Sequence, residues 1–322
     1  MKSTASSLSV WECVRAVCNA PSGCRLALGR ALVPFIFMPP PKSATADVCE
    51  FHSLDDYPSK HARLAHLLGH PERGPAPGEL DFLRSIQNRG IHYTGAIGSS
   101  DYLFLTAVAS ILAPVRAVEI GTSTGFSSAL IAAALHWRHP HVRGPLVDTI
   151  DLHSRYVVDR TKPIGFEIPD LLPELSDAVR VHTSRESEYL RELARRDDLA
   201  FVFIDADHQH PCPLLDLLRV APYVRKAGWV LLHDIELGTM GVNAKEKGEP
   251  LAYGAPFGAE WLFDRWPFPK ISGGNIGAVQ LPLNKSEIAP LALKLMLLPF
   301  EIGPKSHRSM RQALYRNVAD LK

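Results

Sequence analysis

The chain has 322 residues, 46% of them hydrophobic, and a mean hydropathy of −0.01. This composition is typical of a soluble globular protein and excludes disordered and fibrous classes. Lys and Arg total 35 against 34 Asp and Glu, for a formal net charge of +1. Such a balance lacks the basic field that drives nucleic-acid binding, so no nucleic-acid partner is predicted.

Residues 1–75 are predicted to form an N-terminal extension of short helices and loops. Proline-rich breaks at 38–43 and 71–79 interrupt it, and no sustained apolar period supports a core of its own. The apolar stretch 26–38 is shorter than the ~20 residues that cross a bilayer, so no membrane span is predicted. The five cysteines form no C-x-x-C pair, which favours reduced thiols and a cytoplasmic location.

From about residue 76, helices and strands are predicted to alternate. Helices are expected at 79–88 and 101–112, the second capped by Ser100. Strands are expected at 115–120, 146–152, 179–181, 199–205, 229–234 and 276–281, and further helices at 126–137, 187–196, 214–224 and 260–266. Apolar strands alternating with helices predict an α/β fold, in which a doubly wound, mostly parallel sheet carries helices on both faces. We assign this domain to residues 76–284.

Residues 285–322 are predicted to form a basic, helical C-terminal tail. The segment holds seven Lys and Arg against three Asp and Glu, and an apolar run occupies 291–300. A solvated or dimer-packing helix pair is favoured over a membrane-surface anchor. A homodimer is therefore one expected assembly.

Residues 118–127 read VEIGTSTGFS, which predicts a tight turn between a strand and a helix. Gly121 and Gly125 allow the turn and a close ligand, and the helix from Phe126 offers free N–H groups. A dinucleotide-binding turn would read G-x-G-x-x-G. Here the turn reads G-T-S-T-G and Glu119 precedes it, so a ligand with a cationic amine fits better than a pyrophosphate.

This turn, with FVFIDADH at 201–208 and KAGWVLLHD at 226–234, resembles the motifs of class I S-adenosylmethionine-dependent methyltransferases. Their order is similar to that in the catechol and caffeoyl-CoA O-methyltransferases, over about residues 85–282. The resemblance implies a Rossmann-like methyltransferase sheet and S-adenosylmethionine as cofactor. The chain departs from the family twice: Ser123 replaces a frequent glycine, and Ile235 replaces the Asn of the metal-dependent members.

The resemblance also implies which residues bind the cofactor. Glu119 would hold its methionine part, Asp151 its ribose hydroxyls, and Thr183 with Ser184 its adenine. The turn itself would line the cofactor through Gly121, Ser123, Gly125 and Ser127, and Asp205 would also contact it. Each residue has a purely structural alternative, such as a strand-end acid, an ordinary turn or a helix cap.

The segment from Asp205 to Cys212 follows an apolar strand, so its polar groups should emerge at the carboxyl edge of the sheet. Methyl transfer from a sulfonium is an in-line displacement, which needs an aligned acceptor and removal of its proton. His208 stands where the resembling enzymes carry a basic lysine, and an imidazole with a pKa of about 6.5 is a competent base. We predict His208 and Asp205 as catalytic residues; helix capping is the alternative for His208.

Asp205 and Asp234 match two of the family's three metal ligands. With waters, they could hold Mg²⁺ or another divalent cation. Ile235 cannot supply the third ligand, which leaves His233, Asp207 or Glu260. A zinc site made of His208, His210 and Cys212 lacks recognisable tetrahedral spacing.

The sequence therefore predicts an S-adenosylmethionine-dependent O-methyltransferase that acts on a hydroxyl of a small-molecule acceptor. The aromatic segment 250–269 is expected to build the acceptor pocket. Two alternatives remain open: a cofactor-binding or regulatory protein without turnover, and a metal-dependent hydrolase using the Asp/His cluster.

Overall fold

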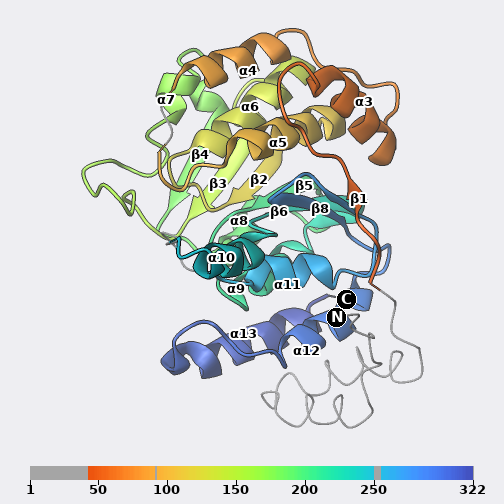
Figure 1. Ribbon diagram of the computed structural model, residues 1–322, viewed down its shortest axis with the longest axis vertical. Helices are drawn as coiled ribbons and strands as arrows, with labels where there is room; N and C mark the ends of the chain where they lie inside the picture. Colours follow the sequence, from red (N-terminus) through yellow and green to blue (C-terminus); the bar gives the residue numbers. More distant parts are fainter. Residues whose placement is uncertain (1–42, 91–92, 250–254, 322) are drawn as a thin grey trace.

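The computed structural model describes residues 43–90, 93–249 and 255–321, and an eight-stranded sheet forms its centre (Figure 1). The strand order is β1-β7-β8-β6-β5-β2-β3-β4. The strands from β2 to β6 run parallel, and β8 is antiparallel to β6 and β7. Their bounds are β1 Asp47–Val48, β2 Ala117–Ile120, β3 Val147–Asp151, β4 Val179–Thr183, β5 Leu199–Ile204, β6 Val224–His233, β7 Lys270–Ser272 and β8 Ile276–Gln280. The predicted mostly parallel sheet is confirmed.

Helices cover both faces of the sheet (Figure 1). One face carries α3 Tyr57–Leu67, α4 Glu79–Asn88, α5 Ser99–Leu112, α6 Phe126–Arg138 and α7 Ile168–Leu171. The other carries α8 Leu190–Leu193, α9 Cys212–Val220, α10 Leu237–Glu246 and α11 Gly258–Asp264, with α12 Ala289–Leu295 and α13 His307–Ala319 outside them. This arrangement confirms the predicted doubly wound α/β fold.

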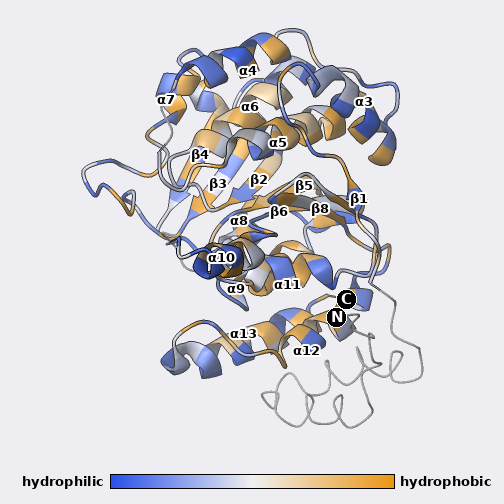
Figure 2. Ribbon diagram, viewed as in Figure 1, coloured by the Kyte–Doolittle hydropathy of each residue, from blue (hydrophilic) through white to orange (hydrophobic). Residues whose placement is uncertain are grey.

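The central strand β5, LAFVFI, is apolar and buried at every position because both sheet faces are covered. In β5, Phe201 and Phe203 pack into the core under α5 and α6, whereas Val202 and Ile204 pack into the core on the α9 side. Successive strand residues point to opposite faces, so a doubly covered strand needs a continuous apolar run. Figure 2 shows hydrophobic residues concentrated in the central strands and in α5 and α6.

The described part of the N-terminal extension packs into the same core as the sheet. Phe51, Tyr57 and Leu64 are fully buried there, and the Tyr57 hydroxyl donates to Glu79 of α4 at 2.5 Å. The short β1 pairs with β7 in parallel. The sequence does not predict this strand, because two residues are too few to show an alternating pattern. That residues 1–75 do not fold alone stays a prediction.

Two predicted helix features are wrong. The helix α5 begins at Ser99 with Gly98 as its N-cap, so Ser100 is not the cap. The helix predicted at 187–196 is a 3-10 turn, Ser187–Tyr189, followed by the four-residue α8. The chain leaves α8 in an extended conformation, and Asp197 adopts a left-handed φ of 58° before β5 begins.

The C-terminal tail is helical, as predicted, but its apolar side is used within the chain. The core beside α9 buries residues of α12 and α13, namely Leu291, Leu295, Leu314 and Val318. Arg308, Arg311 and Arg316 on the outer side of α13 are exposed, so the solvated or dimer-packing pair and the homodimer stay predictions. Among the described residues, no helix combines the length and hydrophobicity that crossing a membrane requires.

Candidate active site

Five parallel strands, β2 to β6, end at one edge of the sheet and carry the predicted site residues. The Asp205 N–H donates to the Ile120 carbonyl and the Gly121 N–H to the Ile150 carbonyl, each at 2.8 Å, so the turns after β2, β3 and β5 are in contact. The strand order reverses at β2, because β3 lies on one side of it and β5 on the other. Open α/β sheets bind ligands at such a reversal.

The glycine turn between β2 and α6 has left-handed backbone conformations at three positions. Gly121 has φ 99°, and an added Cβ would lie 2.0 Å from the Asp205 carbonyl oxygen. Gly125, the N-cap of α6, has φ 88°, and its Cβ would collide with Ile168. Ser123 has φ 48°, a conformation that favours glycine. The serine therefore keeps the backbone shape for which the resembling family frequently uses glycine.

Asp151 ties the second strand to this turn. Its Oδ2 accepts from the N–H groups of Thr122 and Ser123 at 3.1 and 3.0 Å, and its Oδ1 accepts from His153 at 2.7 Å. Thr183 lies opposite Asp151 in the β3–β4 register and is exposed, as is Ser184. The structure thus brings these three predicted cofactor residues to one edge of the sheet.

Glu119 lies beneath the turn and is fully buried. Its carboxylate accepts hydrogen bonds from Ser127 at 2.5 Å, from Thr149 at 2.6 Å and from Ser128. Burial raises the pKa of this carboxyl to about 7, because the loss of solvation outweighs the hydroxyl donors. The predicted contacts of Glu119 and Ser127 with cofactor stay predictions; in the structure both side chains fasten α6 to β2.

Replacing Glu119 by Gln should remove a pH-dependent loss of stability. An acid whose folded pKa is raised from 4.5 to about 7 destabilises the fold increasingly as pH rises through that window. Relative to wild type, Glu119→Gln should therefore gain about 3 kcal/mol of unfolding free energy between about pH 5 and pH 8. Urea unfolding at both pH values measures this; a constant difference would show that Glu119 is not protonated by burial.

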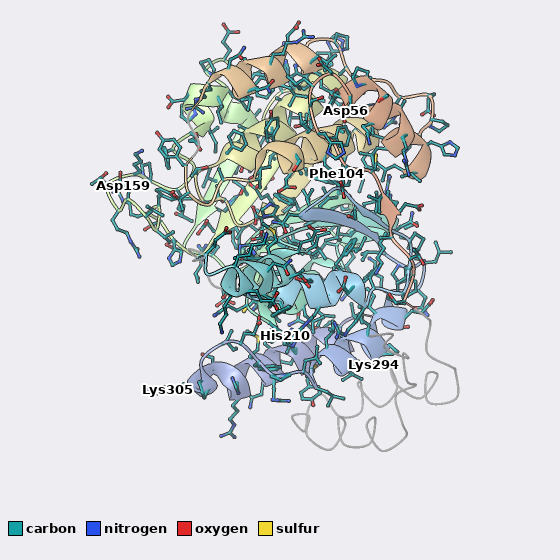
Figure 3. All side chains as sticks on the ribbon, viewed as in Figure 1. Asp56, Phe104, Asp159, His210, Lys294 and Lys305 are labelled. Carbon is teal, nitrogen blue, oxygen red and sulfur yellow. The ribbon has the colours of Figure 1, made fainter. Side chains whose placement is uncertain are left out.

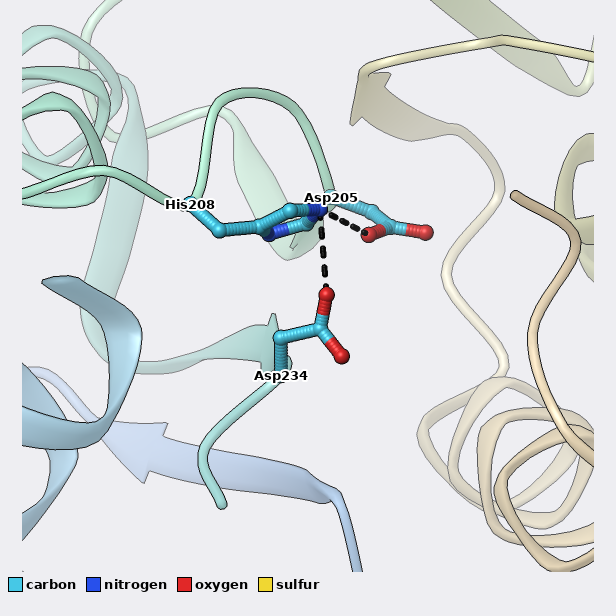
Figure 4. A group of neighbouring side chains, drawn as sticks. All are labelled: Asp205, His208 and Asp234. Carbon is cyan, nitrogen blue, oxygen red and sulfur yellow. Dashed lines mark ion pairs between the residues drawn. The ribbon is translucent and has the colours of Figure 1, made fainter. Parts of the chain in front are cut away.

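Asp205, His208 and Asp234 form a compact cluster at the same edge (Figure 4). His208 Nε2 lies 3.0 Å from Asp234 Oδ2 and 4.0 Å from Asp205 Oδ1. The His208 side chain is 29% exposed, against 12% for each aspartate. One ligand atom from each residue lies within 4.8 Å of the others, a spacing that suits a metal ion.

His233 stands behind Asp205 and links it to α5. Its Nδ1 lies 3.1 Å from Asp205 Oδ1, and its Nε2 lies 3.2 Å from Asp101 Oδ2. Burial acts to lower the pKa of His233, but the surrounding carboxylates outweigh it and raise that pKa well above 6.5. His233 is therefore a cation at neutral pH, and each of its N–H groups faces a carboxylate.

Asp234 is held as an anion. It adopts a left-handed φ of 59° directly after β6, and Asn275 Nδ2 donates to its Oδ1 at 2.6 Å. Burial acts to raise the pKa of Asp234, yet His233, His208 and Asn275 together lower it to about 2. Asp234 can therefore accept a hydrogen bond or bind a cation throughout the neutral range.

The remaining candidate ligands point elsewhere. Asp207 is exposed and accepts from the Gln209 N–H, while Glu260 accepts two hydrogen bonds from Thr239. The ring of His210 is buried with Nε2 3.0 Å from the Leu295 carbonyl, and burial raises the pKa of the Cys212 thiol. Among the described residues, Asp205, His208 and Asp234 form a group with the spacing of metal ligands. His208, His210 and Cys212 do not form such a group, so the structure gives no support for a zinc site there.

Sequence reasoning missed two residues of this site. Asp101 lies in the first turn of α5, within a segment interpreted only as an apolar helix, and Asn275 lies in the turn between β7 and β8. Neither belongs to a motif quoted for the family resemblance. Their contacts with His233 and Asp234 depend on the packing of elements distant in sequence.

Residues 118–235 match the family described as "Methyltransferase domain". The O-methyltransferase TomG from Streptomyces achromogenes, solved with S-adenosylmethionine, is 19% identical, with 71% of this chain and 99% of that chain covered and a TM-score of 0.40. A putative caffeoyl-CoA O-methyltransferase from Staphylococcus aureus is 13% identical, with 69% and 98% covered and a TM-score of 0.42. A comparison with curated proteins found no match.

The family match spans the glycine turn, Asp151, the Asp205–His208 segment and Asp234, the residues that meet at the carboxyl edge of the sheet. The resemblance to methyltransferases read from the sequence is thereby confirmed for this domain. Residues 118–235 therefore form a methyltransferase domain.

Proposed function

We propose that the protein transfers a methyl group from S-adenosylmethionine to a hydroxyl of a small molecule, with His208 as general base. The observation that carries this proposal is the position of His208. Its partly exposed imidazole lies beside two largely buried carboxylates, at the edge where the glycine turn ends β2. A base there can face both a bound cofactor and solvent-borne acceptors.

The residues around the glycine turn fit the cofactor. Asp151 Oδ2 already accepts two hydrogen bonds and Oδ1 one, so Oδ1 retains acceptor capacity for a ribose hydroxyl. The N–H groups of Gly121, Thr122, Ser123 and Gly125 already donate within the chain, so the turn offers the cofactor a close approach to its backbone. When bound, the cofactor supplies an electrophilic methyl group on a sulfonium.

His208 removes the acceptor's proton in this proposal. If its Nε2–H donates to Asp234, Nδ1 keeps a lone pair for the proton of the acceptor hydroxyl. The acceptor oxygen then bonds to the methyl carbon as the carbon–sulfur bond breaks, and the electron pair of that bond stays on sulfur. Asp234 stabilises the imidazolium that results, as carboxylates do beside catalytic histidines.

The cluster also fits a divalent cation. Asp101, Asp205 and Asp234 contribute three negative charges and His233 one positive charge, which leaves a net charge of −2 with His208 neutral. A bound cation would polarise the acceptor oxygen. To bind a metal through Nε2, His208 would have to lose the Nε2 proton that it donates to Asp234. His208 therefore cannot be a metal ligand through Nε2 and, at the same time, a base held in place by Asp234. We propose the base role and a water-rich site at Asp205 and Asp234, with partial metal dependence.

Replacing Asp151 by Ala should weaken cofactor binding. The change removes the ribose acceptor and leaves the Thr122 and Ser123 N–H groups without their carboxylate. The expected loss is about 1.5 to 3 kcal/mol, the range of hydrogen bonds to charged groups. Calorimetry with S-adenosylmethionine and with its demethylated product measures it, and equal affinity in the variant would contradict the assignment.

The overall proposal is tested by offering hydroxyl-bearing small molecules together with isotopically labelled cofactor and following the label by mass spectrometry. Labelled ether or ester products would support it. Cofactor binding without any labelled product would favour a regulatory protein, and acceptor cleavage without cofactor would favour a metal-dependent hydrolase. Residues 255–269, where Phe257 stacks on Trp261, are proposed as the acceptor side; residues 250–254 lie outside the described residues.

A further inference from the structure

The C-terminal tail reaches back to the loop that carries His208. Glu301, which follows α12, accepts the His210 N–H at 2.5 Å through Oε2. The same carboxylate accepts the Phe257 N–H, at 2.9 Å through Oε1 and 3.1 Å through Oε2. One side chain of the tail therefore joins the loop after β5 to the segment before α11.

A second contact from the tail holds the same loop. The His210 ring is 1% exposed, its Nε2 lies 3.0 Å from the Leu295 carbonyl, and it packs edge-on against Phe300. Figure 3 shows His210 on the side of the sheet where α12 and α13 lie. The tail thus contacts both the backbone and the ring of a residue two positions after His208.

The segment before α11 in turn contacts His208. The Gly258 N–H donates to the His208 carbonyl at 3.1 Å, and a Cβ on Gly258 would lie 2.5 Å from that oxygen. Glu301 therefore holds the backbone at two places close to His208. One is Phe257, which precedes Gly258, and the other is His210. The imidazole of His208 is partly exposed, so its position depends strongly on its backbone.

We propose that Glu301 is a positioning residue, which holds the backbone of His208 so that the imidazole stays between Asp234 and the acceptor. The inference rests on the proposed role of His208 as base. A misplaced base slows proton transfer without disturbing the glycine turn, since a shift of about 1 Å can cost up to 10²-fold in rate. Glu301 itself touches neither cofactor nor acceptor in this assignment.

The test compares Glu301→Ala, Glu301→Gln and the tail control Glu287→Ala, each also in a His208→Ala background. Glu301→Ala should lower kcat by about 10-fold or more, with cofactor affinity and KM nearly unchanged. Glu301→Gln should recover most of the loss, because a single oxygen at the Oε2 position is within reach of both N–H groups. Glu287→Ala should behave as wild type.

In the His208→Ala background, Glu301→Ala should cause no further loss of kcat, because the base it positions is gone. An equal loss in both backgrounds, or a loss that Gln does not recover, would overturn the inference while leaving the His208 result intact. A His208→Ala variant with full activity would overturn the proposed base and the inference together. Circular dichroism and thermal melting of each variant identify any loss that comes from unfolding.

Discussion

The His208→Ala variant should lose about 10² to 10⁴-fold in turnover while binding S-adenosylmethionine nearly as tightly as wild type. Proton removal by a placed side chain contributes that range. The ion pairs of the His208 ring are with Asp234 and Asp205, and none is with a residue of the glycine turn. Binding and chemistry should therefore separate: calorimetry measures the first, single-turnover methylation the second.

Two comparisons sharpen this prediction. Exposed His141, in the loop between α6 and β3, is a matched control, and His141→Ala should be fully active. Added imidazole should restore part of the His208→Ala activity if the lost group is a base, whereas added divalent cation should restore it if the lost group is a ligand. Full activity of His208→Ala between about pH 6 and pH 9 would rule out the base assignment.

The sequence predicts the sheet well because a strand that is buried on both faces has a continuous run of apolar residues. A run such as LAFVFI at 199–204 must be apolar throughout when both faces are covered. The glycine turn was equally readable, since left-handed backbone and close approach at Gly121 exclude most other residues. Short elements such as β1 and α8 carry too few residues for a period to appear, and the tertiary packing alone defines them.

The position of the candidate site was predictable, whereas its supporting contacts were not. Asp205, His208 and Asp234 follow apolar strands, so parallel strand ends bring them to one edge. The burial of Glu119 depends on hydroxyls from α6 and β3, and the state of His233 depends on Asp101 from α5. Contacts of this kind join residues far apart in the chain, and neither spacing nor composition reveals them.

The Asp205→Ala variant should lose more activity than wild type treated with a chelator. The Asp205 carboxylate lies 3.1 Å from His233 Nδ1 and 4.0 Å from His208 Nε2. Its removal deprives the buried His233 cation of one partner and removes a candidate metal ligand. Loss of one preorganised electrostatic group in an active site typically costs about 10² to 10³-fold in kcat.

Chelation should cost less, because two carboxylates with several waters form a weak site and Asp205 keeps its protein contacts when the metal leaves. Exposed Asp207 provides the matched control, and Asp207→Ala should stay close to wild type in turnover. Asp205→Asn keeps the side-chain size, so it separates loss of charge from loss of packing. If chelator abolished turnover and Mg²⁺ restored it, partial dependence would be wrong, and binding of the metal through His208 Nε2 would become the arrangement to test first.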